Sequence, residues 1–138
     1  MKYDVFSSLN ALAITNFQQA IQQYKQDINL HPAQWPREHG WEEFRVKRYL
    51  CGENEQFHEH VDVTNREDAR RFLILMVYLN DNFRGGETEF TILGNKITPE
   101  KGKLLVFPPY WNYLHRGNPA EKPGYAKYFL STYLHFIR

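Results

Sequence analysis

The sequence predicts a mainly β fold, a β-sandwich or jelly roll, with one helix at its N-terminal flank. Three observations favour this fold. Apolar residues recur at helical spacing near the N-terminus, but from Trp41 onward they alternate with polar residues. Turn residues then recur at short intervals along the rest of the chain. Aromatic residues make up 16% of the sequence, which suits a small, tightly packed β-domain.

The helix is predicted over about residues 11–28, after a short β-like lead. Its apolar positions are Leu12, Phe17, Ala20, Ile21, Tyr24 and Ile28, and the lead contains Tyr3, Val5 and Phe6. We expect His31 and Pro32 to stop the helix, because a residue that precedes proline avoids helical backbone. The segment from there to Gly40 is expected to be a connection.

The β-core is predicted over about residues 41–137, as seven or eight short strands. The clearest strands are expected at residues 44–49, 57–63, 72–79, 88–93, 103–107 and 125–137. The nearly unbroken apolar run at residues 72–79 indicates a central strand with both faces covered. The opposite sheet and the N-terminal helix are expected to cover it.

Length and charge exclude several classes of protein. The chain has 138 residues, of which 42% are hydrophobic, so we expect a single domain over residues 1–138. With 17 basic and 16 acidic residues the formal net charge is +1, which argues against nucleic acid as a partner. A mean hydropathy of -0.64 argues against a membrane partner, and the N-terminus lacks the apolar stretch of a signal peptide.

The cysteine content indicates the cellular compartment and limits the kinds of metal site that the chain can form. Cys51 is the only cysteine, so the chain forms no internal disulfide, and we expect a reducing, cytoplasmic location. A cysteine-rich metal site is excluded for the same reason. Any bound metal must be held by histidines and carboxylates.

The first candidate for chemistry is the stretch of His58, His60 and Asp62. Side chains two apart on a strand share a face, so these three are expected to point the same way. A histidine beside a carboxylate forms two thirds of the 2-His-1-carboxylate triad that holds Fe(II). His115 supplies the missing histidine, if the fold brings it near. The alternatives are a solvated strand edge and an exposed loop histidine.

The second candidate is Lys127, which lies within an otherwise apolar and aromatic strand. Burying its ammonium is costly unless an anion pairs with it, and no neighbour on the strand can do so. The carboxylate of a bound dicarboxylate would neutralise it. The alternative is a lysine that extends from an edge strand to the surface.

These residues lie in stretches that resemble a known family, the Fe(II)/2-oxoglutarate-dependent dioxygenases, and within it the prolyl 4-hydroxylase-like group. The resemblance covers roughly residues 41–135, and its most specific piece is the segment YLNDNFRGGETEF at residues 78–90. The other matching stretches, in the family's order, are RYLCG at 48–52, FHEHVD at 57–62, GKLLVF at 102–107 and LHRG at 114–117, followed by Lys127.

The resemblance implies a double-stranded β-helix, or jelly roll, in which His60, Asp62 and His115 are the catalytic iron ligands. It implies that Lys127 pairs with the distal carboxylate of the cosubstrate, 2-oxoglutarate. Four further residues match positions of the cosubstrate pocket: Tyr49, Tyr78, Thr88 and Ser131. The gap between Gly52 and Phe57 is about one residue longer than the family's pattern, which leaves the register of Tyr49 open. Residues 118–124 are expected to bulge out as a loop, and His58 to contact substrate at the site entrance.

The resemblance also implies an activity. A dioxygenase of this group uses Fe(II), 2-oxoglutarate and O2, with ascorbate as a further candidate, to hydroxylate an unactivated C–H bond, and it forms succinate and CO2. The expected substrate is a prolyl residue in a polypeptide, lying beside Arg48, Trp111, Tyr113 and Tyr133, and the protein is expected to be a monomer or a weak homo-oligomer.

Three alternatives remain open. One is a hydroxylase of a free amino acid or small metabolite, and another is a non-catalytic β-sandwich binding module on the same scaffold. The third is a zinc hydrolase, which would use the histidines and Asp62 but would leave Lys127 without a role.

Overall fold

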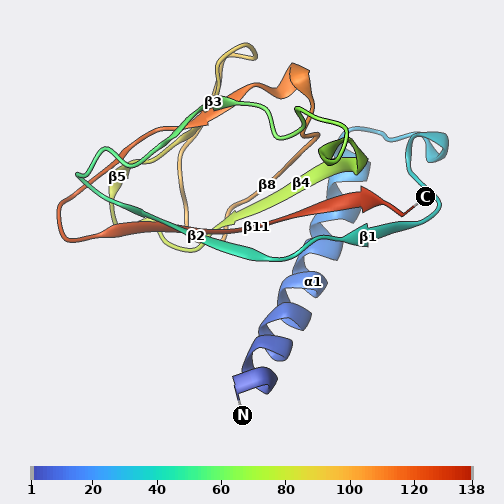
Figure 1. Ribbon diagram of the computed structural model, residues 1–138, viewed down its shortest axis with the longest axis horizontal. Coiled ribbons are helices and arrows are strands. Elements are labelled where there is room, and N and C mark those ends of the chain that lie inside the picture. The colour runs from blue at the N-terminus through green and yellow to red at the C-terminus, as the bar shows by residue number, and fades with distance from the viewer. Residues whose placement is uncertain (1, 138) are drawn as a thin grey trace. The chain divides into compact units, whose positions relative to one another are not determined.

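The computed structural model describes residues 2–137, in which the chain forms two compact units, Met1–Glu38 and His39–Arg138. The first unit contains the helix α1 (Lys2–Asp27) and the short 3-10 helix η1 (Pro32–Gln34). The second contains all of the strands (Figure 1). No helix in the described part of the chain combines the length and the apolar character that crossing a membrane requires.

The helix α1 begins earlier than the sequence predicts. It starts at Lys2 rather than near residue 11, so the prediction of a β-like lead at Tyr3, Val5 and Phe6 is wrong. Residues 2–27 contain neither glycine nor proline, so nothing in the local backbone stops the helix from extending over the whole segment. Alternating apolar residues over so short a stretch do not specify a strand without a partner strand.

The helix ends at Asp27, close to the predicted end near residue 28, although His31 and Pro32 are not what stops it. Asn29 adopts a left-handed backbone with a φ of 50°, and its N–H donates to the carbonyl of Gln26 at 3.0 Å. The N–H of Leu30 donates to the carbonyl of Lys25 at 2.9 Å. These two bonds satisfy carbonyls at the end of the helix in the manner of a Schellman motif. His31 instead caps η1, where its Nδ1 accepts from the N–H of Ala33.

The second unit is built of two main sheets and a two-stranded ribbon. The larger sheet has the order β1-β11-β4-β8, with β2 also paired to β11, and the smaller has the order β3-β9-β6-β7. The ribbon joins β10 and β5. The strands are β1 (His39–Trp41), β2 (Arg45–Leu50), β3 (Phe57–His60), β4 (Arg71–Tyr78), β5 (Arg84–Gly85), β6 (Thr88–Phe90), β7 (Asn95–Ile97), β8 (Leu104–Phe107), β9 (His115–Gly117), β10 (Ala120–Glu121) and β11 (Ala126–Phe136).

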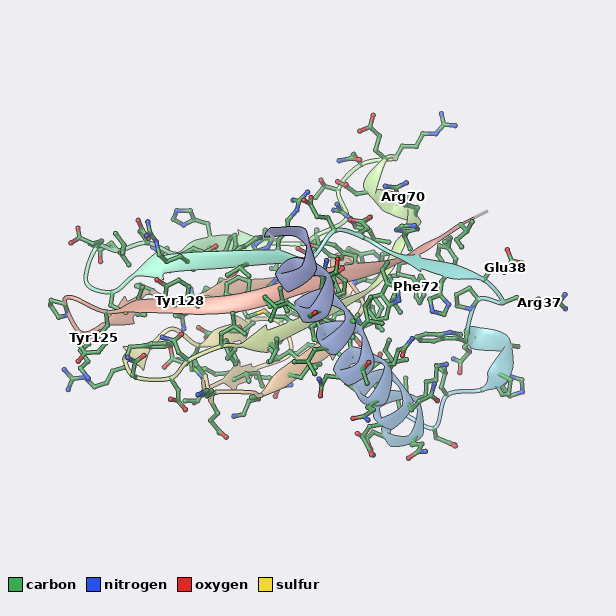
Figure 2. The ribbon with its side chains drawn as sticks, turned by 90° about the horizontal axis from the view of Figure 1, so that it is seen from below. Arg37, Glu38, Arg70, Phe72, Tyr125 and Tyr128 are labelled. Atoms are coloured by element: carbon green, nitrogen blue, oxygen red, sulfur yellow. The ribbon has the colours of Figure 1, made fainter. Side chains whose placement is uncertain are left out.

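This arrangement confirms the predicted mainly β fold. In Figure 1 the layer with β3 lies above the layer with β2, β4 and β11. Figure 2 views the larger sheet from below, with Tyr125 and Tyr128 at one end and Phe72 and Arg70 at the other. The central strand β4 pairs with β11 on one side and β8 on the other, and Leu73 to Met76 are buried in succession.

The hydrophobic core draws on both sheets. Ile74, Met76 and Tyr78 project from β4 into a buried cluster that also contains Phe90, Leu105, Phe107 and Phe129. Phe90 of the smaller sheet meets Phe107 of the larger sheet edge to face, with their ring centroids 4.8 Å apart. This contact holds the two sheets together on the side where the candidate site lies.

Short strands are where the sequence prediction was least accurate. β3 ends at His60 and β6 at Phe90, both earlier than predicted, and β1, β5, β7, β9 and β10 were not predicted. The segment expected as a loop at residues 118–124 contains β10, which pairs with β5. Strands of two or three residues are too short to show a period, so only their tertiary pairing defines them.

We predict that Phe107→Ala lowers the free energy of unfolding by about 3–5 kcal/mol, because it leaves a cavity between the sheets. Phe107 is only 5% exposed. The control is Ile92→Ala, whose side chain is 69% exposed and whose effect should stay within about 0.5 kcal/mol. Denaturant unfolding of both variants measures the difference. Equal stability of the two variants would contradict the described core.

Candidate active site

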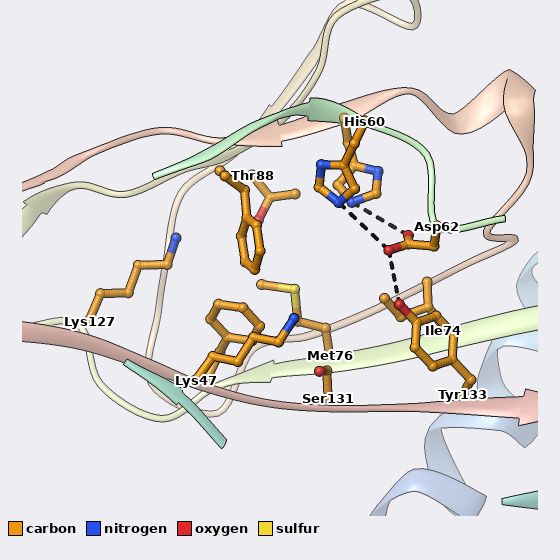
Figure 3. Close-up of a pocket in the computed structure, with 13 residues that line it drawn as sticks. Lys47, His60, Asp62, Ile74, Met76, Thr88, Lys127, Ser131 and Tyr133 are labelled. Atoms are coloured by element: carbon orange, nitrogen blue, oxygen red, sulfur yellow. Dashed lines mark hydrogen bonds and ion pairs between the residues drawn. The ribbon is translucent and has the colours of Figure 1, made fainter. Parts of the chain in front are cut away.

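Strand pairing brings two histidines together at one end of the smaller sheet. His60 is the last residue of β3, and its register partner on β9 is His115. Their ring centroids are 4.4 Å apart. Asp62, just beyond the end of β3, reaches both rings: one carboxylate oxygen lies 3.6 Å from Nε2 of His60, and the other lies 3.6 Å from Nε2 of His115 (Figure 3).

Hydrogen bonds of the His60 and His115 rings determine which ring nitrogen of each can act as an acceptor near Asp62. Nδ1 of His60 lies 2.7 Å from the carbonyl of His58, and Nδ1 of His115 lies 2.9 Å from the carbonyl of Tyr113. Because a carbonyl only accepts, each Nδ1 carries a proton, and each ring in its neutral form presents a lone pair at Nε2. The carbonyl bonds also fix the orientation of the rings, as they do in many metal sites.

These lone pairs and the Asp62 carboxylate converge with no donor between them. The ligand atoms of the three residues lie within 4.8 Å of one another, and Oδ2 of Asp62 is buried without a hydrogen-bond partner. Such a cluster of acceptors is unfavourable unless a cation lies among them. Two imidazoles and one carboxylate are the donor set of Fe(II) oxygenases, so the residues present fit that metal.

Tyr133 fixes the carboxylate of Asp62. Its hydroxyl donates to Oδ1 at 2.9 Å, the oxygen nearer to His60, and Oδ2 faces His115. The guanidinium of Arg71 lies 4.2 Å from the Tyr133 ring, and Glu42 holds Arg71 through hydrogen bonds of 3.0 and 3.1 Å. Its hydroxyl is thereby committed to the candidate metal ligand, and the expected contact of Tyr133 with a peptide stays a prediction.

The surroundings shift the pKa values of the triad in different directions. Interaction with Asp62 raises the pKa of His60, while burial lowers the pKa of His115. Burial alone would raise the pKa of Asp62, but His60, His115 and the Tyr133 hydroxyl together bring it below its usual value. Asp62 is therefore a carboxylate and His115 a neutral imidazole at neutral pH, as metal ligation requires.

Lys127 is buried at the other end of the same cavity, only 2% exposed. Its ammonium donates to the carbonyl of Gly86 at 2.8 Å. Burial lowers the pKa of Lys127 to about 8, against which Glu87 acts in the opposite direction. The alternative of a surface lysine is therefore excluded, and the carbonyl contact leaves the charge of the ammonium unneutralised.

The need for glycine at position 86 follows from this contact. Gly86 has a φ of 70°, and an added Cβ would lie 2.9 Å from the Phe83 ring and 3.1 Å from Cδ of Lys127. A side chain there would strain the backbone and displace Lys127. The Gly-Gly-Glu-Thr segment thus brings the backbone close to the buried lysine.

The cavity has a volume of about 430 Å³, including its open mouth, and lies within the second unit. Lys127 and the triad of His60, Asp62 and His115 all line it, as do the predicted residues Thr88 and Ser131. The residues of its wall that the sequence analysis did not assign to the site are Lys47, Phe57, Ile74, Met76, Gly117 and Phe129, while Tyr133 was expected beside the substrate. Alternation along β11 gives Phe129 and Tyr133 directly, since they share a face with Lys127 and Ser131.

Two predicted pocket residues, Tyr49 and Tyr78, lie outside this lining. Tyr78 is fully buried, and its hydroxyl shares a hydrogen bond of 2.5 Å with Oγ1 of Thr88. Tyr49 is the register partner of Lys127, and its ring stacks on Phe129 at 5.8 Å. The Lys127 ammonium lies 5.6 Å from the ring centroid of Tyr49 and 6.0 Å from that of Tyr78. Both rings therefore pack around Lys127 and Thr88 rather than forming the cavity wall.

His58 does not share the ligand face, contrary to the expectation from alternation. The register between β3 and β9 shifts between Phe57 and His60, so the side chains do not alternate regularly there. Phe57 and His60 both line the cavity, while His58 is exposed and does not. This irregularity selects His60 over His58 as the partner of Asp62.

Comparisons with known proteins agree with this geometry. Residues 44–135 match the family model described as the 2OG-Fe(II) oxygenase superfamily. A curated protein of Acanthamoeba polyphaga mimivirus, named "Putative prolyl 4-hydroxylase", is 32% identical over 88 residues. The match covers 56% of this chain and 36% of that protein, so the chain spans about a third of its relative's length.

Solved structures share the fold. A viral collagen prolyl hydroxylase from Paramecium Bursaria Chlorella virus-1, in a 2OG complex, has a TM-score of 0.71 at 24% identity, over 91% of this chain and 73% of that one. A prolyl-4-hydroxylase of Pseudomonas putida has a TM-score of 0.61 at 22% identity, over 85% and 62% of the chains. A prolyl hydroxylase from Trichoplax adhaerens, in complex with a hypoxia inducible factor peptide, has a TM-score of 0.59 at 23% identity, over 70% and 44%.

The family match covers the second unit almost from end to end and contains every residue of the candidate site. The predicted jelly roll is confirmed by the fold shared with the solved prolyl hydroxylases. The chain therefore belongs to the 2OG-Fe(II) oxygenase superfamily, in which it is similar to the prolyl 4-hydroxylases.

Proposed function

We propose that the protein is an Fe(II)- and 2-oxoglutarate-dependent dioxygenase that hydroxylates an unactivated C–H bond of a prolyl residue in a polypeptide. One observation carries the proposal: the converging acceptor atoms of His60, Asp62 and His115 line the same cavity as a buried ammonium, and Oδ2 of Asp62 has no hydrogen-bond partner. The first is suited to a metal cation and the second to a carboxylate. A zinc hydrolase would use the first and leave the second without a role.

In this proposal His60, Asp62 and His115 hold the iron, and Lys127 receives the distal carboxylate of 2-oxoglutarate. When bound, the iron supplies the oxidative chemistry, in which O2 and 2-oxoglutarate yield succinate, CO2 and the hydroxylated substrate. Thr88 and Ser131 line the cavity between these groups, and Tyr133 keeps the Asp62 carboxylate oriented. Ascorbate would serve to keep the iron reduced.

The aromatic and apolar side chains of the cavity keep water away from the reacting groups. Phe129 and Phe57 contribute rings to the wall, and Ile74 and Met76 contribute aliphatic surface from β4. Exclusion of water strengthens the interaction of Lys127 with a carboxylate. All of the proposed residues lie between positions 39 and 138, and we propose that the N-terminal helix belongs to the same catalytic domain.

The proposed substrate rests on the relatives. The mimivirus protein is named as a prolyl 4-hydroxylase, and the solved relatives include a prolyl hydroxylase with a bound peptide. Trp111, which is 81% exposed, offers a free aromatic face of the kind that packs against a proline ring. A polypeptide is therefore the proposed partner, and we propose that the enzyme acts as a monomer or a weak homo-oligomer.

We predict that the anaerobic protein with Fe(II) and 2-oxoglutarate shows the visible metal-to-ligand charge-transfer band of a chelated complex. His115→Ala should abolish the band, because one ring of the metal site is lost. His58→Ala is the matched control and should retain it, since His58 is exposed and outside the cavity. Absence of the band from the unmodified protein would contradict the proposal. Loss of the band in His58→Ala would show that His58 is needed at the metal site, contrary to the assignment made above.

The affinity for 2-oxoglutarate should fall at high pH. The pKa of Lys127 is lowered to about 8, and only its ammonium form attracts a carboxylate. The dissociation constant should therefore be level below pH 8 and rise above it by up to about tenfold per pH unit. Calorimetric titration at several pH values measures this. The Lys127→Met variant should bind 2-oxoglutarate weakly, and its dissociation constant should not rise above pH 8. If the same rise is seen in that variant, a group other than Lys127 titrates.

We predict that proline-containing peptides, and not free proline, stimulate succinate formation in the presence of Fe(II), 2-oxoglutarate and O2. Mass spectrometry should find the peptide one oxygen atom heavier, with the oxygen on a prolyl residue. Stimulation by a free amino acid, with peptides inactive, would favour the small-metabolite hydroxylase instead. Full binding of 2-oxoglutarate with no turnover on any substrate would favour a binding module.

A further inference from the structure

Lys47 places a second lysine ammonium in the cavity. It lies on β2, two residues before Tyr49, and lines the same cavity as the triad and Lys127. Figure 3 shows its side chain reaching toward the half of the cavity that holds His60 and Asp62, while Lys127 enters from the other end. The sequence analysis assigned Lys47 no role, because a lysine on a strand with charged neighbours is usually solvated.

The ammonium of Lys47 has no counter-ion. Among residues 2–137 no hydrogen bond or ion pair is formed to it. Two aromatic rings lie close to it: the ammonium is 4.6 Å from the ring centroid of Phe57 and 5.9 Å from that of Phe129. Burial lowers its pKa, so the ammonium is partly removed from water. A desolvated charge without a partner is unfavourable, which favours binding of an anion from outside the chain.

Asp62 is the closest acidic group in the cavity, but it is already engaged. Its charge acts on Lys47, and Lys47 in turn acts on His60, so the ammonium lies at the metal end of the cavity. Asp62, however, accepts from Tyr133 through Oδ1 and turns Oδ2 toward His115. It forms no ion pair with Lys47 among the described residues.

The two lysines mark opposite ends of the cavity. The carboxylate that acts on Lys127 is Glu87, whereas the charged groups near Lys47 are Asp62 and Arg45. The ring of Phe129 lies within 6 Å of both ammonium groups, at 5.7 Å from Lys127 and 5.9 Å from Lys47. Two cations in one cavity repel each other unless an anion compensates both. A molecule with a carboxylate at each end matches this pattern better than a monoanion does.

We propose that Lys47 binds the carboxylate of 2-oxoglutarate next to the keto group, so that lysines hold both ends of the cosubstrate. This inference rests on the proposed function and assigns the distal carboxylate to Lys127. The carboxylate next to the keto group belongs at the metal end, since that group and the keto oxygen are the atoms able to chelate iron. Lys47 is then a binding residue for every 2-oxo acid, while Lys127 distinguishes dicarboxylic from monocarboxylic ones.

The test compares two ligands that differ only at the distal end. The anaerobic protein, saturated with Fe(II), is titrated with 2-oxoglutarate and with 2-oxopentanoate, which lacks the distal carboxylate, and calorimetry gives both dissociation constants. Lys47→Met should weaken both acids by a similar factor, about tenfold or more. Lys127→Met should weaken 2-oxoglutarate alone. Lys47→Arg, which keeps the charge, should recover most of the affinity.

Arg45→Met is the matched control. Arg45 lies on the same strand and face as Lys47, and its substitution by methionine removes the same charge. The Arg45 side chain, however, is 63% exposed and paired with Glu43. It should bind both acids as the unmodified protein does. Melting temperatures of all variants establish that they are folded, and Lys47→Arg tests the site if Lys47→Met is unstable.

The outcomes separate this inference from the proposed function. Unchanged affinities in Lys47→Met overturn the inference and leave the proposed function standing. Weakening of 2-oxoglutarate alone in Lys47→Met also overturns it, because Lys47 would then serve the distal carboxylate. If the unmodified protein binds neither acid in the presence of Fe(II), the proposed function itself fails.

Discussion

The candidate site depends on the pairing of β11, which is fixed on both sides. β4 pairs with it along one side, and β2 and β1 pair with successive parts of the other. A strand held in this way cannot slip by one residue without turning its whole inner face outward. That face carries Lys127, Phe129, Ser131 and Tyr133, which line the cavity, and the hydroxyl of Tyr133 orients Asp62.

The smaller sheet provides the opposite wall by the same means. Pairing of β3 with β9 places His60 opposite His115, and the carbonyl bonds of both rings turn their Nε2 atoms inward. The two walls meet through Phe90 and Phe107, which also contact the His115 ring at 5.6 and 5.1 Å. The same aromatic contacts therefore pack the core and position His115, a candidate metal ligand.

The cavity holds charges that folding alone does not favour. Lys127 and Lys47 are both desolvated, and Oδ2 of Asp62 is buried without a partner. Each represents a cost to the stability of the empty protein, which a bound cation and a bound dianion would relieve. Binding and stability are thus expected to be linked, a common property of sites that are assembled before their ligands arrive.

Much of this was accessible from the sequence, because it depends on residues close together in the chain. The apolar run of β4, the turn residues, the pair of His60 and Asp62 and the buried position of Lys127 all produce local patterns. Short strands such as β9 and β10 produce none, and neither did the full extent of α1. The register shift in β3, which places His58 and His60 in different surroundings, also could not be predicted from the sequence, since it arises from pairing with β9.

The sequence by itself therefore determined the fold class, and it predicted the residue types of the candidate metal site and Lys127 as a candidate anion-binding residue. The tertiary structure alone decided which side chains share the cavity. It added Lys47, placed the Tyr133 hydroxyl on Asp62, and left Tyr49, Tyr78 and His58 outside the cavity lining. The physical reason is distance along the chain. Hydrophobic period and residue chemistry act over a few residues, whereas contacts such as that of Tyr133 with Asp62, which are 71 positions apart, exist only after the strands have paired.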